Sequence, residues 1–344
     1  MTPVNIPGKF GYGSMSLTWT PTPKTEAEAI QAIKYVLDKH QVRFVNGGEF
    51  YGPDSVNLKY LGAFWKHFGC DYPDLVISVK GSIDVTTLKP DGSRESISRS
   101  INNFVSYFPQ NKLQRPKLIF EIARVDTSVP YEQTIGFINE FVGDGVIDGI
   151  SLSEVGVGSI EKALSVAPIS SVEVEFSLLC QDIFSNGVLK KAAEENLTIV
   201  AYSPLCRGFL TDRSADDFSA FFDLCHQPGD IRGHIDRFSK ENFFENLKIV
   251  AKLKDYAETK GTTLESLAIS WIVAYSELEN YNGISKFPKI IPIPSGSSSD
   301  KIDQNLGQIV SLSKADLDDI KKITDCFEVK GYRYNAKVKH LDFA

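Results

Sequence analysis

The chain of 344 residues carries 37 basic and 44 acidic residues, a net charge of -7, and 42% of its residues are hydrophobic. This composition is typical of a globular protein with a large core, and an acidic balance without a basic block argues against nucleic acid as a partner. No apolar run reaches the length of a membrane span and the first residues do not resemble a signal peptide. We therefore expect a cytoplasmic protein, with nuclear presence also compatible, and no membrane partner.

The five cysteines are scattered, with no CxxC pair and no Cys/His cluster at the spacing of metal ligands. Reduced thiols and no bound metal are the expected state. Cys206 lies in a loop interpreted below as functional, and an ordinary free thiol is favoured there over a redox switch.

Short apolar segments rich in β-branched residues alternate with segments of helical period. Thr25, with Glu28 three positions later, predicts a helix that starts with a capping box, and apolar residues recur at helical spacing from Ile97 to Phe108. Eight strands are predicted at residues 10–17, 42–47, 75–80, 117–123, 147–153, 171–177, 197–202 and 290–293.

This alternation predicts an α/β fold, a (β/α)8 TIM barrel, as a single domain over residues 1–344. An open doubly wound sheet is disfavoured, because residues 10–16 hold only Gly11 and Gly13 and no GxGxxG turn. Two features interrupt the repeat. Residues 206–240 form a long segment after the seventh strand, typical of a lid, and an extra helix at 315–326 precedes an extended charged end.

Active sites of such barrels lie at the carboxyl ends of the strands. Tyr51 follows the second predicted strand and Lys80 ends the third, so a phenol and an ammonium face one mouth. A nearby cation stabilises a phenolate, and such a pair suits proton delivery to a carbonyl oxygen. Taken alone, a Tyr and a Lys at strand ends are more often an ordinary rim pair.

Six segments, in matching order, resemble the aldo-keto reductases. They correspond to the second-strand signature, the catalytic-lysine strand, the segment whose tyrosine stacks on nicotinamide, two parts of the lid, and the final cofactor segment. These are residues 45–52, 77–80, 200–205, 230–232, 237–238 and 291–305. Physically, the serines at 295–299 before a helix that opens near Asp300 suit a phosphate cradle, and Lys301 favours NADP over NAD.

The resemblance implies an NADPH/NADP cofactor and assigns roles residue by residue. The catalytic residues are Tyr51, Lys80 and Asn46, and the substrate-binding residues are Trp19, Ala123 and Arg124. The cofactor-binding residues are Ser153, Glu154, Glu173, Tyr202, Ser203, Leu205, Arg207, Ser295, Ser297, Lys301, Gln304 and Asn305.

The chain departs from the family pattern at four of these positions. Asn46 stands in place of Asp, Ala123 of His, Glu154 of Asn and Glu173 of Gln. With Asn46 in place of an anion, Lys80 is expected to lose its proton more readily. Glu121, on the same strand face as Ala123, is predicted to reach Lys80 as a substitute.

The phrases at 48–53, 121–126 and 151–155 further resemble the fungal pyridoxal reductase branch. This resemblance implies reversible NADPH-dependent reduction of pyridoxal to pyridoxine by a monomer, with a small aldehyde substrate. Two alternatives stay open: a general aldehyde or ketone reductase, and an NADPH-binding regulatory barrel with little turnover.

Overall fold

A computed structural model describes residues 2–84 and 87–344. Its central feature is a sheet of eight strands in the order β1-β2-β3-β4-β5-β6-β7-β10, with every neighbouring pair parallel. The strands are β1 (Tyr12–Gly13), β2 (Phe44–Gly48), β3 (Val76–Gly81), β4 (Lys117–Ile122), β5 (Gly149–Ser153), β6 (Ser171–Glu175), β7 (Thr198–Tyr202) and β10 (Ile290–Pro292).

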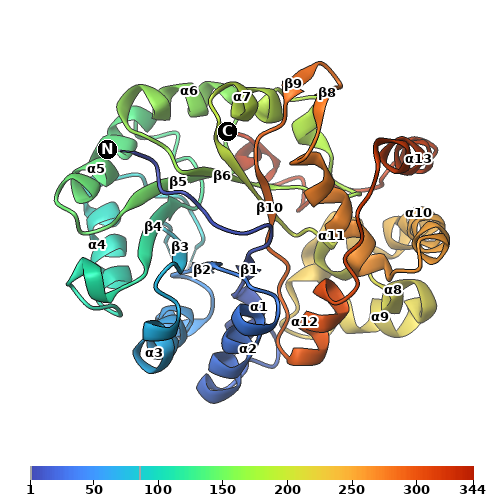
Figure 1. Ribbon diagram of the computed structural model, residues 1–344, viewed down its shortest axis with the longest axis horizontal. Helices are drawn as coiled ribbons and strands as arrows, with labels where there is room; N and C mark the ends of the chain where they lie inside the picture. The colour runs from blue at the N-terminus through green and yellow to red at the C-terminus, as the bar shows by residue number, and fades with distance from the viewer. Residues whose placement is uncertain (1, 85–86) are drawn as a thin grey trace.

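The sheet closes between its two edge strands. The amide of Gly11 donates to the carbonyl oxygen of Pro292 at 3.0 Å, and that of Gly13 to Pro294 at 3.2 Å. Figure 1 shows the strands at the centre of a ring of helices, so the predicted (β/α)8 barrel is confirmed.

The helices are α1 (Met15–Thr18), α2 (Glu26–Lys39), α3 (Val56–Phe68), α4 (Arg94–Val105), α5 (Tyr131–Gly143), α6 (Val157–Val166), α7 (Val188–Glu194), α8 (Asp212–Asp216), α9 (Phe218–Cys225), α10 (Lys240–Thr259), α11 (Leu264–Tyr275), α12 (Ser299–Leu306) and α13 (Lys314–Asp325).

The first predicted strand, 10–17, is wrong in its second half. Only Tyr12 and Gly13 pair as β1, and the chain then turns into α1. The hydroxyl of Ser14 explains the turn, because it donates to the carbonyl oxygen of Asn46 at 2.9 Å and bonds to Asn57 of α3. The predicted capping box of Thr25 and Glu28 at the start of α2 is confirmed.

The barrel interior is layered. Its lower layer is apolar and includes Phe44, Val76 and Ile119, covered by Val4 and Ile6 of the N-terminal segment. Two or four residues further along the same strands, the inward positions become polar. Asn46, Lys80 and Glu121 are all buried there, and Lys80 pairs in register with Glu121 across β3 and β4. The strand pattern thus places buried charge directly above an apolar floor.

Two segments cover the carboxyl ends of the strands. The predicted lid, residues 206–240, contains α8, α9 and short 3-10 turns rather than an unstructured loop. The tail after α13 returns to the barrel, where the amide of Ala344 donates to the carbonyl oxygen of Glu154 at 3.2 Å. Lid and tail also meet, since the amide of Asp236 donates to the carbonyl oxygen of Tyr334 at 2.7 Å. A hairpin of β8 (Glu279–Tyr281) and β9 (Ile284–Lys286) was not predicted.

Among the residues that the structure describes, no helix is both long and apolar enough to cross a membrane. The same residues contain no group of three or more His, Cys, Asp or Glu side chains arranged to hold a metal ion.

Candidate active site

Tyr51 lies just beyond β2, buried against aromatic neighbours. Its ring is 5.7 Å from that of Trp19 and 5.1 Å from that of Phe50, and its side chain is 8% exposed. Burial raises the pKa of Tyr51 to about 12, while the charge of Lys80 acts in the opposite direction. The lowering by Lys80 expected from the sequence is therefore present but outweighed, and the phenol is protonated and ready to donate at neutral pH.

Lys80, at the end of β3, sits in a buried cluster that we call the strand cluster: Asn46, Lys80, Glu121 and Glu173. The ammonium donates to Asn46 Oδ1 at 2.9 Å and makes a short contact with Glu173 Oε1. Its nitrogen lies 3.5 Å from Glu121 Oε1, so the predicted approach of Glu121 to Lys80 is confirmed.

The expectation that Lys80 loses its proton readily is wrong. Burial alone would lower the pKa of Lys80, but the carboxylates of Glu121 and Glu173 outweigh it and raise that pKa above its usual value. Asn46 takes the place of the family's Asp and so removes one anion beside Lys80. Glu121 from β4 and Glu173 from β6 supply negative charge in its place. The cation beside Tyr51 is therefore permanent at physiological pH.

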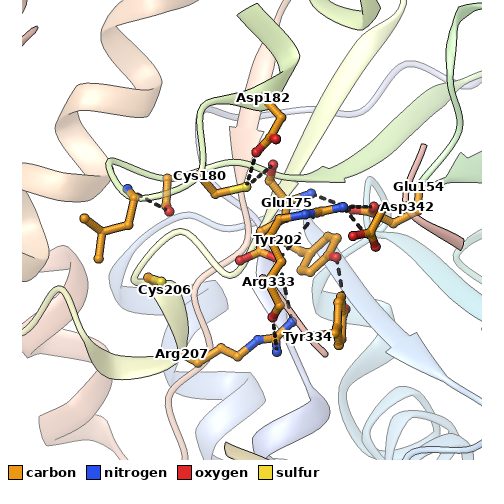
Figure 2. A network of polar contacts seen from close by, with 12 residues as sticks. Glu154, Glu175, Cys180, Asp182, Tyr202, Cys206, Arg207, Arg333, Tyr334 and Asp342 are labelled. Carbon is orange, nitrogen blue, oxygen red and sulfur yellow. Dashed lines mark hydrogen bonds and ion pairs between the residues drawn. The ribbon is translucent and has the colours of Figure 1, made fainter. Parts of the chain in front are cut away.

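A second buried cluster, the tail cluster, is formed by Arg333 with Glu154, Glu175 and Asp342 (Figure 2). Arg333 binds both oxygens of Glu154 at 3.1 and 2.7 Å and lies 3.5 Å from Glu175 and 3.1 Å from Asp342. Burial acts to raise the pKa of Glu154, but Arg333 outweighs it and lowers that pKa to about 2. Glu154 is thus a fixed anion that binds the tail to the end of β5.

Tyr334, next to Arg333, lies against three residues predicted to bind substrate or cofactor. Its hydroxyl accepts from Arg124 Nη2 at 3.1 Å and is 3.0 Å from the hydroxyl of Tyr202. The guanidinium of Arg207 lies over its ring at 4.3 Å (Figure 2). The tail therefore forms one wall of the mouth beside Tyr202.

The turn after β10 has the geometry of an anion cradle. Ser298 caps α12 by accepting from the amide of Lys301, and Asn305 Nδ2 donates to the carbonyl oxygen of Ser295 at 2.8 Å. A Cβ on Gly296 would lie 2.7 Å from Ile302, so only glycine lets the turn pack this closely on α12. The amides of this helix start are favourable to a phosphate.

Cations from separate loops gather around this turn. Burial lowers the pKa of Lys301, and the charges of Lys24, Arg213 and Arg232 lower it further. Arg232 is paired with Asp230 of the lid at 2.6 Å. Mutual repulsion of this kind is relieved by a bound anion, so the residues present fit the phosphates of a nicotinamide dinucleotide.

The loop after β7 stores backbone strain. Ser203, Cys206 and Arg207 have φ of 48°, 47° and 57°, in the left-handed region that disfavours side chains. Glu154, at the end of β5, has φ of 54°. Strained non-glycine residues of this kind cluster at functional sites. The thiol of Cys206 is buried and its pKa is raised by burial, as expected for an unreactive thiol.

The structure gathers the predicted residues into two areas of the mouth. Asn46, Tyr51, Lys80 and Glu173 lie together with Trp19 beside them, and Ala123, one residue beyond β4, is 2% exposed. Ser295, Ser297, Lys301, Gln304 and Asn305 lie in the turn and first two turns of α12, whereas Arg124, Ser153, Glu154, Tyr202, Ser203, Leu205 and Arg207 lie at or after the ends of β4, β5 and β7. Their roles toward cofactor and substrate stay predictions.

The sequence reasoning missed several residues of the mouth. Arg333, Tyr334 and Glu175 were not predicted, nor was Glu173 as the partner of Lys80. Lys24, in the segment after β1, and Arg213, in the segment after β7, were also missed, although a cation in a segment that follows a strand is a readable signal. Nothing local marks Arg333, because its partner Glu154 is 179 positions away.

Comparisons with known proteins agree with this geometry. The family model described as "Aldo/keto reductase family" matches residues 9–325. A Saccharomyces cerevisiae protein is 37% identical, over 94% of this chain and 95% of its own length. A Schizosaccharomyces pombe protein is 32% identical over 96% of each chain. Both are named, provisionally, as pyridoxal reductases.

Solved structures share the fold. The glycerol dehydrogenase of Gluconobacter oxydans superposes with a TM-score of 0.76 at 16% identity, over 94% of each chain. An aldo/keto reductase of Klebsiella pneumoniae, in complex with NADP and acetate, gives a TM-score of 0.65 at 15% identity, over 95% of this chain and 94% of its own. With the family model spanning nearly the whole barrel, this chain belongs to the aldo/keto reductase family.

Proposed function

We propose that this protein is an NADPH-dependent carbonyl reductase that interconverts pyridoxal and pyridoxine. The observation that carries the proposal is the buried, protonated phenol of Tyr51 beside the permanently charged Lys80, at the same barrel mouth as a helix start with several cations around it. A proton donor and an anion cradle at one mouth are what reduction by a phosphorylated hydride donor requires.

When bound, the nicotinamide supplies a hydride to the carbonyl carbon. Tyr51 donates its phenolic proton to the carbonyl oxygen, so that an alcohol and a phenolate result. Lys80 stabilises the phenolate electrostatically, because its ammonium is held in place by Asn46 and Glu173. The rings of Trp19 and Phe50 pack around Tyr51 and limit the access of water to the phenol.

The choice of NADPH over NADH rests on charge. Lys301 of α12 is repelled by three other cations: Lys24 from the loop before α2, Arg213 from α8 of the lid, and Arg232 from a later turn of the lid. A dinucleotide with an additional 2′-phosphate relieves more of this repulsion than one without it. A relative in Schizosaccharomyces pombe, 30% identical, carries NADP(+) in its name, which supports the same choice.

Three observations support an aromatic aldehyde such as pyridoxal. The two relatives reported above are named for this substrate. Ala123 is small and buried at the end of β4, where a larger side chain would take up space beside the reacting group. The guanidinium of Arg124, held by Tyr334, lies next to Ala123 and can interact with the acidic ring hydroxyl of pyridoxal.

The test is the oxidation of NADPH by purified protein with pyridoxal, compared with a simple benzaldehyde. We expect pyridoxal to be reduced, with Tyr51→Phe slower by about 10²- to 10⁴-fold, the usual contribution of a general acid. Equal rates for wild type and Tyr51→Phe contradict the mechanism. Reduction of benzaldehyde alone indicates a general aldehyde reductase, and tight NADPH binding without turnover of any aldehyde indicates a regulatory barrel.

A further inference from the structure

The most constrained part of the molecule outside Tyr51 is a closed ring of hydrogen bonds around Lys80. The ammonium bonds to Glu173 Oε1 and, at 2.9 Å, to Asn46 Oδ1. The ring is completed by Asn46 Nδ2, which donates to Glu173 Oε2 at 2.6 Å. Three strands, β2, β3 and β6, thus fix the ammonium with no residue from a loop.

Glu121 is a looser member of the strand cluster. Its Oε2 accepts from Ser78 at 3.2 Å and from Asn46 at 3.4 Å, both long contacts. Its Oε1 is buried, and it receives no hydrogen bond from the residues that the structure describes. Glu121 adds negative charge near Lys80, but it does little to orient it.

The cluster holds two carboxyl groups and one ammonium. A net negative charge buried in the barrel is costly, so the pair of carboxyl groups keeps a proton more readily than isolated acids do. In agreement, burial and the charge of Glu121 raise the pKa of Glu173, with Lys80 acting against them. Such a proton belongs to the pair. Both oxygens of Glu173 accept hydrogen bonds, from Lys80 and from Asn46, which is the arrangement expected of an ionised carboxylate.

We propose that Glu173 is a positioning residue for the reduction: it holds Lys80 charged and oriented toward Tyr51, in partnership with Asn46. This inference rests on the proposed function for its kinetic consequence. It gives Glu173 a role other than the expected binding of the nicotinamide carboxamide, because each of its carboxylate oxygens already accepts a hydrogen bond within the strand cluster.

The kinetic test compares Glu173→Gln with the double variant Asn46→Asp/Glu173→Gln. The first keeps the shape of the side chain and removes its charge, and the second supplies a carboxylate within 2.9 Å of Lys80 from β2. We expect Glu173→Gln to lower kcat with pyridoxal by about 30-fold or more, with KM for NADPH and pyridoxal changed less than about threefold. The double variant should recover at least about tenfold of that loss.

The pH profile gives a readout that mere structural damage would not move. In Glu173→Gln the ammonium has lost its main partner, so its pKa falls and kcat should decline at a lower pH than in wild type. The double variant should restore the profile. Glu121→Gln should have a smaller effect than Glu173→Gln, and Glu140→Gln, at a surface pair with Arg94, is the control for the substitution itself.

A measurement independent of turnover uses ¹⁵N NMR of the Lys80 ammonium, assigned with Lys80→Arg. We expect the pKa of Lys80 to fall in Glu173→Gln and to return in the double variant. Unchanged kcat and unchanged Lys80 pKa in Glu173→Gln overturn the proposal. So does a rise in KM for NADPH that Asn46→Asp does not repair, because it assigns Glu173 to cofactor binding. If wild type reduces no aldehyde, the proposed function fails while the NMR result still decides the role of Glu173.

Discussion

The strand cluster and the tail cluster both place a cation among buried carboxylates at one barrel mouth, but they are assembled differently. Every member of the strand cluster lies on a strand, in positions fixed by the sheet register. In the tail cluster, Glu154 and Glu175 lie at strand ends, while Arg333 and Asp342 come from the irregular C-terminal segment. The first site is built when the barrel closes, and the second only when the tail docks on it.

This difference assigns separate tasks to the two clusters. The strand cluster sets the charge next to Tyr51. The tail cluster holds Tyr334 against Arg124, Tyr202 and Arg207, and it bonds to the lid through Asp236. Changes in the strand cluster should therefore act on chemistry, and changes in the tail cluster on binding and on the order of the tail.

The largest effect is expected from Lys80→Met. It leaves two buried carboxyl groups without a cation, and breaking a buried pair in this way costs about 3–5 kcal/mol of unfolding free energy at neutral pH. Loss of the cation beside Tyr51 should also lower kcat by about 10²-fold or more. Urea unfolding and NADPH oxidation measure the two effects. Lys9→Met, at an exposed pair with Glu277, is the control and should change neither.

Next comes Arg333→Met, which removes the cation of the tail cluster. We expect the free energy of unfolding to fall by about 3 kcal/mol if the tail unfolds together with the barrel. Amide exchange in residues 329–344 should become faster. KM for substrate and NADPH should rise more than kcat falls, which is the reverse of the strand-cluster variants. Lys337→Met, exposed on the same segment, is the control. A fall in kcat at constant KM would remove the distinction between the clusters.

The barrel could be predicted from the sequence because the patterns that indicate strands and helices are local. Apolar segments of strand length alternate with helical periods, and each strand end can be located within a few residues. Strand ends alone placed Tyr51 and Lys80 at one mouth, whereas their predicted role came from the resemblance to the aldo-keto reductases. Glu121 followed from alternation along β4. The first strand was predicted too long because Met15 and Leu17 are apolar. In the structure α1 begins at Met15, and the hydroxyl of Ser14 bonds to the backbone of β2.

The partners of Arg333 and the true partner of Lys80 could not be predicted in this way. Glu173 was assigned by resemblance to the cofactor, and only the closed barrel shows that its side chain reaches β3. Arg333 lies in a segment with no periodic pattern, and its contact with Glu154 depends on where the whole tail runs. Pairings between distant segments are a property of the folded chain, so local patterns do not encode them.

The two clusters should respond to pH in opposite ways: acid should reduce the stabilisation by the tail cluster, and alkali should reduce that by the strand cluster. Arg333 outweighs burial and lowers the pKa of Glu154 to about 2, so its stabilising contribution is full above its ordinary value near 4.5 and is lost as pH falls toward 2. Burial and Glu121 raise the pKa of Glu173 above its ordinary value of 4.5. The contribution of this titration to stability is therefore full below pH 4.5 and is lost as pH rises through the raised pKa.

The contribution of Glu154 is on the order of 3 kcal/mol by linkage. Urea unfolding from pH 3 to pH 9 should therefore show that Glu154→Gln flattens the acid side of the profile and that Glu173→Gln flattens the alkaline side. The two single variants serve as controls for one another. If both variants alter the same side, the opposite titration of the clusters is contradicted.

The smallest effect is expected from Tyr334→Phe, which keeps the ring under Arg207 but removes the hydroxyl between Arg124 and Tyr202. Loss of such hydrogen bonds costs about 1 kcal/mol, so KM for pyridoxal should change by about fivefold or less while kcat stays near that of wild type. Tyr334→Ala also removes the ring and should release the tail as Arg333→Met does, which amide exchange would detect. A large fall in kcat in Tyr334→Phe would instead make the tail part of the site that contains Tyr51, and the division of tasks between the two clusters would not hold.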